Sequence, residues 1–266
     1  MSRIRKWPAA TDGAVAIAER GSLRTLHIGG EAIQSAMRVD APDELELHYT
    51  QAMMAFLLFQ PQPARITMVG LGGGSIAKFV LRRMPQTRLA VVEISARVVD
   101  VARRYFSLPP DSDRFSVIVE DGARLIAREP QSCEVLLLDA FDDGEQISGL
   151  CSQSFYDSAR DALAPGGVLV ANFMAEDRRY DAYLRRIEKS FQGRLLQLAA
   201  ADHVNAIVLA FRDGPARISW EELRRRARDQ KARFGLPFER FLSSLRALNS
   251  QTAKYLLIAA DAASKA

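Results

Sequence analysis

The sequence predicts an α/β protein, in which a parallel sheet with helices on both faces follows a small antiparallel β unit. From residue 65 onward, short apolar strands alternate with helical segments, the pattern of a parallel sheet. A glycine-rich loop joins the first of these strands to its helix, as in nucleotide-binding folds. Before residue 40, short alternating segments are separated by glycine turns, which indicates hairpins.

The composition is that of an ordinary globular protein. The chain has 266 residues, of which 48% are hydrophobic and 26% charged, so intrinsic disorder and collagen-like repeats are excluded. The 36 basic and 32 acidic residues leave a net charge of +4, and because the basic residues are dispersed we expect a solvated surface and no nucleic-acid partner. The basic run of residues 224–231 is also expected to be a solvated helix face.

Location and metal content are predicted from what the sequence lacks. The first residues have no apolar run behind them, and the longest apolar stretch, residues 52–59, is too short to cross a bilayer. We therefore expect a cytoplasmic protein with no membrane partner. The two cysteines form no pair, and Cys133 is expected to be a packing residue. No metal is predicted, because the three histidines have no metal-binding spacing.

The first sixty residues are predicted to form a separate unit. Strands are expected at residues 14–18, 23–28 and 32–39, with glycines in the turns between them. Apolar residues at helical spacing predict a helix over residues 44–59, which ends before Pro61. The predicted domains are residues 1–60 and residues 61–266.

The second domain is predicted to hold the parallel sheet. Strands are expected at residues 65–70, 89–93, 115–119, 135–139 and 167–173, with helices at residues 76–84, 95–105, 123–128 and 154–162. An antiparallel pair at residues 194–199 and 205–211 would close the sheet. Residues 218–260 are expected to be helical, with Ser219 as a candidate cap.

The glycine loop of residues 70–75 and the acidic residue after the next strand predict a nucleoside site. Glycines let a backbone approach a ligand closely, and the helix behind them favours polar groups. Glu93 ends the next strand 19 residues after Gly74, where a carboxylate can accept hydrogen bonds from both ribose hydroxyls. Either feature alone also fits a tight turn or an exposed strand end.

Asp121 extends this site to a third strand. It opens a helix, so it is either a helix cap or a partner for the exocyclic amine of adenine. The loop, Glu93 and Asp121 together indicate an adenosine-containing cofactor. No Gly-Lys-Ser/Thr sequence accompanies the glycines, so a phosphate is not required. An S-adenosyl compound fits best, and NAD fits less well.

Asp139 and Asp142 follow the fourth strand. Two carboxylates three residues apart could hold a cationic amine and accept its proton as it becomes a nucleophile. Burial and mutual repulsion would raise the pKa of one of them. The alternative is an ordinary turn rich in Asp and Gly. At this edge of the sheet we expect the functional role.

These motifs resemble the spermidine synthase (polyamine aminopropyltransferase) family and its bacterial relatives. The resemblance covers roughly residues 26–173 and includes the loop of residues 70–75, Val91–Ile94, Glu120–Gly122, the Asp139-x-x-Asp142 pair and residues 163–170. Residues 30–34 and 47–49 look like the hairpin and helix start of that family.

The resemblance implies a fold and a set of roles. The fold would be a seven-stranded class I S-adenosylmethionine-methyltransferase-like (Rossmann-like) domain with a small N-terminal antiparallel β-domain, usually in a homodimer. The donor would be decarboxylated S-adenosylmethionine or S-adenosylmethionine, and the partner a small-molecule amine. Asp139 would accept the amine proton and Asp142 would help to hold the amine. The implied cofactor-binding residues are Gly70, Gly72, Gly73, Gly74, Glu93, Ile94, Asp121 and Gly122, and the implied substrate-binding residues are Gln34, Tyr49 and Asp142.

The sequence departs from the family at three places. Gly73 stands where the family loop has an Asp that contacts the aminopropyl arm, and Asp143 stands where a Pro is usual. Residues 48–51 read His-Tyr-Thr-Gln, in place of the usual Tyr-His-Glu. Aminopropyl transfer is the first expectation. An S-adenosylmethionine-dependent methyltransferase is an alternative, because a neutral loop does not repel a methionine carboxylate. A non-catalytic relative is the other alternative.

Overall fold

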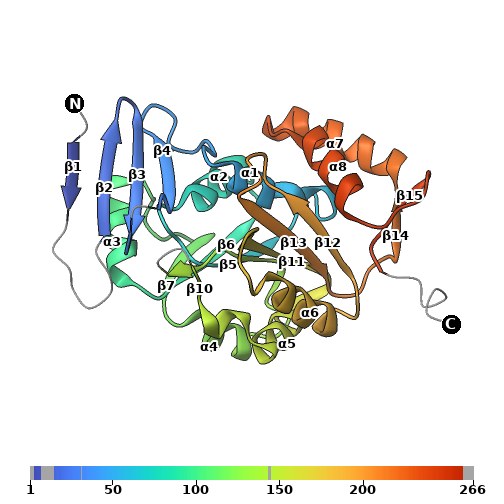
Figure 1. The fold of residues 1–266 in the computed structure, drawn as a ribbon. Coiled ribbons are helices and arrows are strands. Elements are labelled where there is room, and N and C mark those ends of the chain that lie inside the picture. The colour runs from blue at the N-terminus through green and yellow to red at the C-terminus, as the bar shows by residue number, and fades with distance from the viewer. Residues whose placement is uncertain (1–2, 7–14, 31, 143–144, 260–266) are drawn as a thin grey trace.

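A seven-stranded sheet forms the centre of the molecule (Figure 1). The computed structural model describes residues 3–6, 15–30, 32–142 and 145–259. The strands lie in the order β12-β13-β11-β8-β5-β6-β7. Their bounds are β5 Arg65–Val69, β6 Arg88–Glu93, β7 Phe115–Val119, β8 Cys133–Leu138, β11 Leu163–Met174, β12 Leu195–Ala199 and β13 Asn205–Phe211.

The direction of strand addition reverses beside β5. From β5 the chain builds outward in parallel to β6 and then β7, and it crosses back to place β8 on the other side of β5. β11 continues the parallel sheet beside β8, whereas β13 and β12 are antiparallel to their neighbours. Such a reversal opens a crevice at the carboxyl ends of the two central strands, between β5 and β8.

The helices cover both faces of this sheet. They are α1 His48–Met53, the 3-10 helix η1 Met54–Leu58, α2 Ser75–Arg83, α3 Ala96–Tyr105, α4 Gly122–Arg128, the 3-10 helix η2 Ser148–Cys151, α5 Gln153–Ala162, α6 Tyr180–Ser190, α7 Trp220–Phe234 and α8 Phe238–Leu248. Serine side chains cap three of them: Ser95 accepts from Val98 N, Ser152 from Phe155 N, and Ser219 from Glu222 N. The predicted cap at Ser219 is therefore confirmed.

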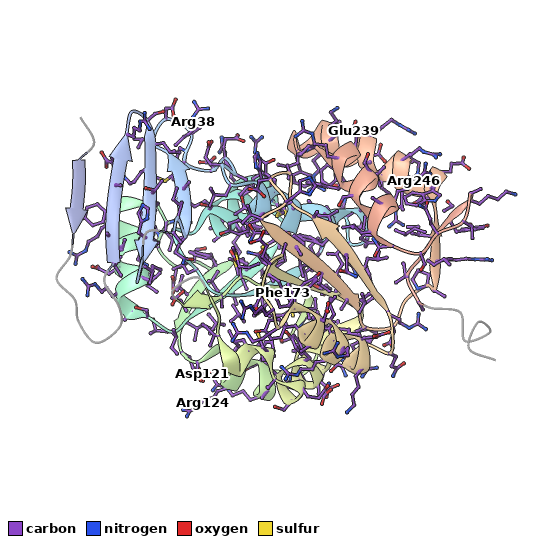
Figure 2. The ribbon with its side chains drawn as sticks, in the orientation of Figure 1. Arg38, Asp121, Arg124, Phe173, Glu239 and Arg246 are labelled. Atoms are coloured by element: carbon purple, nitrogen blue, oxygen red, sulfur yellow. The ribbon has the colours of Figure 1, made fainter. Side chains whose placement is uncertain are left out.

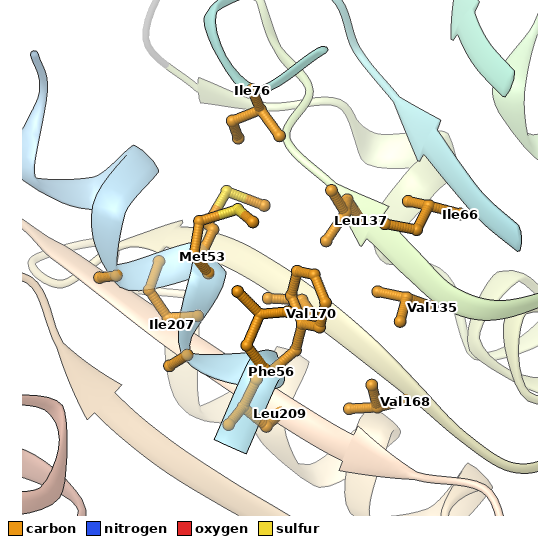
Figure 3. Close-up of a cluster of buried hydrophobic side chains, with 14 of the residues drawn as sticks. Met53, Phe56, Ile66, Ile76, Val135, Leu137, Val168, Val170, Ile207 and Leu209 are labelled. Atoms are coloured by element: carbon orange, nitrogen blue, oxygen red, sulfur yellow. The ribbon is translucent and has the colours of Figure 1, made fainter. Parts of the chain in front are cut away.

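Alternate residues of each strand enter different cores, because side chains along a strand point to opposite faces. On one face, Ile66, Val135 and Val170 pack with Met53 and with Phe56 of η1, as Figure 3 shows. On the other face, Leu136, Leu138 and Leu169 pack against the helices α4, α5 and α6. The near-continuous apolar runs in β8 and β11 fit strands that are buried on both sides.

The N-terminal residues form a separate four-stranded antiparallel sheet, at the left of Figure 1. Its strands, in sheet order, are β1 Arg3–Lys6, β2 Val15–Arg20, β3 Leu23–Ile28 and β4 Ser35–Arg38. Leu26 and Met37 of this sheet pack against Val101 of α3 and Phe106. Leu45 and residues 52–58 instead pack in the core of the central sheet. A domain boundary near residue 60 stays a prediction.

Several predicted elements differ in the structure. Residues 218–260 are not uniformly helical, because β14 (Arg217–Ser219) pairs with β15 (Tyr255–Leu257) and buries Leu256 beneath the C-terminal helices. The predicted helix of residues 44–59 is shorter and divided between α1 and η1. Four elements were not predicted from the sequence: α6, β1, and the short pair β9 (Phe141–Asp142) and β10 (Glu145–Gln146). β11 also begins four residues before its predicted start, since residue 163 already pairs with Cys133.

Candidate active site

The glycine loop follows β5 and lies directly against the end of β8. Gly70 N donates to Val92 O at 2.8 Å, and Gly70 has φ +95°, a region that favours glycine. A Cβ atom on residue 70 would lie 2.0 Å from the carbonyl oxygen of Asp139. The loop therefore reaches Asp139 only because residue 70 has no side chain.

The other loop glycines face different neighbours. Gly72, with φ +53°, lies near the hydroxyl of Ser35, and Gly74, with φ +70°, is the N-cap residue of α2 and packs against Leu108. At Gly73, a Cβ atom would lie 2.8 Å from Cδ1 of Phe106 and 3.0 Å from Cβ of Ser35. Phe106 and Ser35 thus fill the space that a side chain at position 73 would need.

Glu93 holds two loops together at the end of β6. Its Oε2 accepts from Leu71 N at 3.0 Å, and its Oε1 accepts from Ser95 N at 2.9 Å. Burial raises the pKa of this carboxyl, and the backbone hydrogen bonds oppose that shift. Because each carboxylate oxygen has two lone-pair sites and three backbone N–H groups bond this carboxylate, it keeps the capacity to accept a hydroxyl of a ligand.

Asp121 is the N-cap of α4, and Figure 2 shows it with Arg124 at the start of that helix. Its Oδ1 accepts from Ala123 N at 2.8 Å and from Arg124 N at 3.3 Å. The next residue must be small, because a Cβ atom on Gly122 would lie 2.5 Å from Cγ1 of Val69. The capping role predicted for Asp121 is thus present, and the same side chain also lines the cavity described below.

Asp139 stands just after β8 and is half-buried. Burial raises the pKa of its carboxyl to about 6, opposed by hydrogen bonds from Asn172 and Tyr49. The Asn172 amide donates to Oδ1 at 2.9 Å. The single proton of the Tyr49 hydroxyl has two acceptors within reach, Asp139 and Gln34 O at 3.3 Å, and burial and the Asp139 charge raise the pKa of Tyr49. A carboxyl with a pKa near 6 is suited to accept a proton at neutral pH.

These residues surround one cavity of about 490 Å³ between the N-terminal unit and the carboxyl edge of the central sheet. Nine of the residues that the sequence analysis assigned to the site line it: Gln34, Tyr49, Gly70, Gly72, Glu93, Ile94, Asp121, Gly122 and Asp139. Gly73 and Gly74 are not among the described lining residues. Asp142 lies in β9, but its side chain is outside the described part of the chain, as is Asp143.

Other residues of the cavity wall were not predicted from the sequence. They include Ser35, Thr50, Ser95, Ile147 and Leu150. Ile147 and Leu150 follow the Asp139–Asp142 segment closely, so their position was a usable signal. Ser35 and Thr50 belong to the N-terminal unit and to α1, and no motif marks them. Asn172, which contacts Asp139, was also missed.

The described residues contain neither a candidate metal centre nor a candidate membrane span. No group of three or more His, Cys, Asp or Glu side chains among them could hold a metal ion. His48 contacts Asp202 at 3.3 Å, and His27 contacts the hydroxyl of Thr25 at 3.0 Å. Within the same ranges of the chain, no helix is long and apolar enough to cross a membrane.

Solved structures with the same fold define the class of protein. A probable spermidine synthase from Corynebacterium glutamicum superposes with a TM-score of 0.71 at 21% identity, over 94% of this chain and 97% of the other. A spermidine synthase in complex with the transition-state analogue AdoDATO has a TM-score of 0.69 at 20% identity, over 91% and 84%. Human methyltransferase-like protein 13 in complex with SAH has a TM-score of 0.60 at 24% identity, over 77% and 95%. The fold is therefore the seven-stranded methyltransferase-like fold with an N-terminal β unit.

Sequence relatives narrow this class to one family. The model of the spermine/spermidine synthase domain matches residues 46–192. The polyamine aminopropyltransferase of Chromobacterium violaceum is 41% identical over 92% of this chain and 94% of its own length. That of Neisseria meningitidis serogroup B is 38% identical over 91% and 92%. The chain belongs to the spermine/spermidine synthase family.

Proposed function

We propose that this protein is a polyamine aminopropyltransferase, which moves an aminopropyl group from decarboxylated S-adenosylmethionine to an amine. The observation that carries the proposal is the position of Asp139, in the cavity wall against the glycine loop and with a pKa near 6. The names of the relatives that align over nine-tenths of the chain support it.

The cavity has a donor end and an acceptor end. Glu93 would accept hydrogen bonds from the ribose hydroxyls of the donor, and Asp121 would bind the adenine amine through Oδ2 while Oδ1 caps α4. Gly70, Gly72 and Ile94 would contact the nucleoside from the same side. Gln34 and Tyr49 would line the acceptor end, where Asp142 is also proposed to hold the amine.

Asp139 would carry the chemical step. The acceptor amine is a cation at neutral pH, and the Asp139 carboxylate would bind it and take one proton. The freed nitrogen lone pair attacks the carbon next to the sulfonium, the carbon–sulfur bond breaks, and its electrons stay on sulfur. Methylthioadenosine leaves, and positive charge moves from sulfur to nitrogen. A carboxylate placed at that nitrogen stabilises the developing charge.

Methyl transfer is not favoured. The methyltransferase neighbour is 24% identical and shows the fold alone, whereas relatives at 38–41% identity are named polyamine aminopropyltransferases. Position 73 is neutral, and Phe106 and Ser35 fill the space beside it. We propose that the donor ammonium is held without a loop carboxylate. A homodimer in the cytoplasm is also part of the proposal, by analogy with the family.

The test is a product assay with the purified full chain. Decarboxylated S-adenosylmethionine is supplied with putrescine, cadaverine or spermidine, and mass spectrometry detects methylthioadenosine and the extended amine. Intact S-adenosylmethionine serves as the control donor. An extended amine formed only from the decarboxylated donor supports the proposal. A methylated product from the intact donor, or no product from any pair, contradicts it.

A further inference from the structure

Two buried amides lie behind Asp139, on the side away from the cavity. Asn172 is in β11 and is 1% exposed, and Asn205 is in β13 and is 8% exposed. Strand pairing places Asn172 opposite Ile207, so Asn205 is its diagonal neighbour on the same face. A buried amide is costly unless it is hydrogen-bonded. The hydrogen bonds of these two amides, and which group donates in each, therefore constrain how the amides are oriented.

The hydrogen bonds run in one direction. Asn205 Nδ2 donates to Asn172 Oδ1 at 3.0 Å, and Asn172 Nδ2 donates to Asp139 Oδ1 at 2.9 Å. Turning the Asn172 amide over would oppose two N–H donors at Asn205 and set a carbonyl oxygen against a carboxylate. With the Asn205 amide in this orientation, in which Nδ2 also donates to Met174 Sδ at 3.7 Å, only the N–H end of Asn172 can face Asp139.

We propose that Asn172 and Asn205 are positioning residues that keep Oδ1 of Asp139 a hydrogen-bond acceptor, so that the substrate proton is taken up on Oδ2. This inference rests on the proposed function, because it assumes that Asp139 is the base. An acceptor already committed to an N–H group gains little from binding a proton. The other oxygen is then the site that an incoming ammonium can use, because the Tyr49 hydroxyl has Gln34 O as a second acceptor.

The chain of hydrogen bonds from Asn205 through Asn172 to Asp139, called the relay below, also affects how readily Asp139 is ionised. Burial favours the protonated carboxyl, whereas the Asn172 bond favours the carboxylate. Among the described side chains, the titratable groups around it are Tyr49 from α1, and Glu93 from β6 with Asp121 from the start of α4, which share the cavity wall. None of these side chains fixes the orientation of the Asn172 amide, which depends on Asn205 in β13.

The decisive variant is Asn205→Asp. A carboxylate at position 205 accepts from Asn172 Nδ2, which turns the carbonyl end of Asn172 toward Asp139 and favours the protonated form of Asp139. We expect the acidic limb of the pH profile of kcat/KM to move upward by about one pH unit, with about fivefold lower kcat/KM at pH 6. KM for the donor should stay unchanged. Asn205→Leu, which removes the donor without reversing it, should shift the limb in the same direction but less.

A matched control separates the relay from the loss of a buried amide. Gln230 in α7 is 6% exposed, and its Oε1 is buried without a partner among the described residues. Gln230→Met should leave the pH profile unchanged. NMR titration of the Asp139 carboxyl in wild type and Asn205→Leu gives a readout that is independent of turnover.

The outcomes distinguish the relay from the proposed function. An upward shift in both Asn205 variants, but not in Gln230→Met, supports the relay. If Asp139→Asn is inactive and the folded Asn205 variants keep the wild-type pH profile and Asp139 pKa, the relay is wrong and the base assignment stands. If Asp139→Asn keeps wild-type turnover, the proposed role of Asp139 is wrong and the relay has no role in catalysis.

Discussion

Gly70 and Asp139 are in contact across the two central strands of the sheet: a Cβ atom on residue 70 would lie 2.0 Å from the Asp139 carbonyl oxygen. The contact joins the loop after β5 to the residue after β8, at the point where the strand order reverses. The proposed donor loop and the proposed base are thus held together by backbone, and each constrains the place of the other.

Gly70→Ala tests this contact. The new methyl group meets backbone atoms that cannot turn away, and φ +95° is strained for alanine. We expect the free energy of unfolding to fall by about 3 kcal/mol or more, measured by urea denaturation. The control is Gly21→Ala, which has φ +61° but no atom within 4 Å and should cost about 1 kcal/mol. Equal losses in the two variants would contradict a close approach at position 70.

Asp139→Asn tests the desolvation of the proposed base. Since the folded-state pKa is raised from 3.8 to about 6, the carboxyl stabilises the fold below pH 4 and loses that contribution as the pH rises through 6. The variant should therefore be more stable than wild type at pH 8, by about 2 kcal/mol, and match it near pH 4. Chemical denaturation at the two pH values measures this. A variant less stable than wild type at pH 8 would show that the carboxylate is not desolvated.

Gly73→Asp tests whether a loop carboxylate can be restored. Its Cβ atom would press on Phe106, which is fully buried, and on Ser35. We expect a loss of about 1–3 kcal/mol in stability and no tighter binding of decarboxylated S-adenosylmethionine, measured by thermal unfolding and calorimetry. Gly149→Asp is the control, because that glycine lines the cavity and has no atom within 4 Å of its Cβ position. A stable Gly73→Asp protein with higher donor affinity would refute the steric account.

Lys78 is expected to affect how the free energy of unfolding changes at alkaline pH. Its ammonium donates to Phe106 O at 2.6 Å, and burial lowers its pKa to about 8. A lowered pKa means that the folded state loses its proton first, so wild type should gain stability relative to Lys78→Met as the pH rises from about 8 to about 10.5. The relative gain should be on the order of 2 kcal/mol. Parallel pH dependences of the two unfolding free energies would show that Lys78 is not desolvated.

The parts of the fold that were predicted correctly are those with a local signal. Apolar runs such as residues 135–138 directly indicate parallel strands that are buried on both faces. The glycine loop was recognised because it stands between a strand and a helix. α6 was missed although Tyr180, Tyr183 and Ile187 follow helical spacing. The pairing of β14 with β15 joins segments nearly forty residues apart, and no local pattern encodes it.

The residues of the candidate site also divide into those that a local sequence signal predicts and those that it does not. Glu93, Asp121 and Asp139 end or follow strands whose order implies a shared edge, so their meeting in one cavity could be predicted. The contact from Asn172 to Asp139 depends on the register of β8 and β11, and that from Asn205 to Asn172 on the register of β11 and β13. Phe106 reaches Gly73 through the packing of the N-terminal sheet on α3. These contacts depend on tertiary packing, which a single sequence does not display.

The central claim is that Asp139 accepts the amine proton during aminopropyl transfer. The most direct measurement is kcat/KM of wild type and Asp139→Asn between pH 5 and 9, with decarboxylated S-adenosylmethionine and the best of the tested amines. We predict an acidic limb near pH 6 in wild type, set by the raised pKa of Asp139, and a loss of at least about a hundredfold in the variant with donor binding retained. Equal rates and equal pH profiles for the two proteins would contradict the claim.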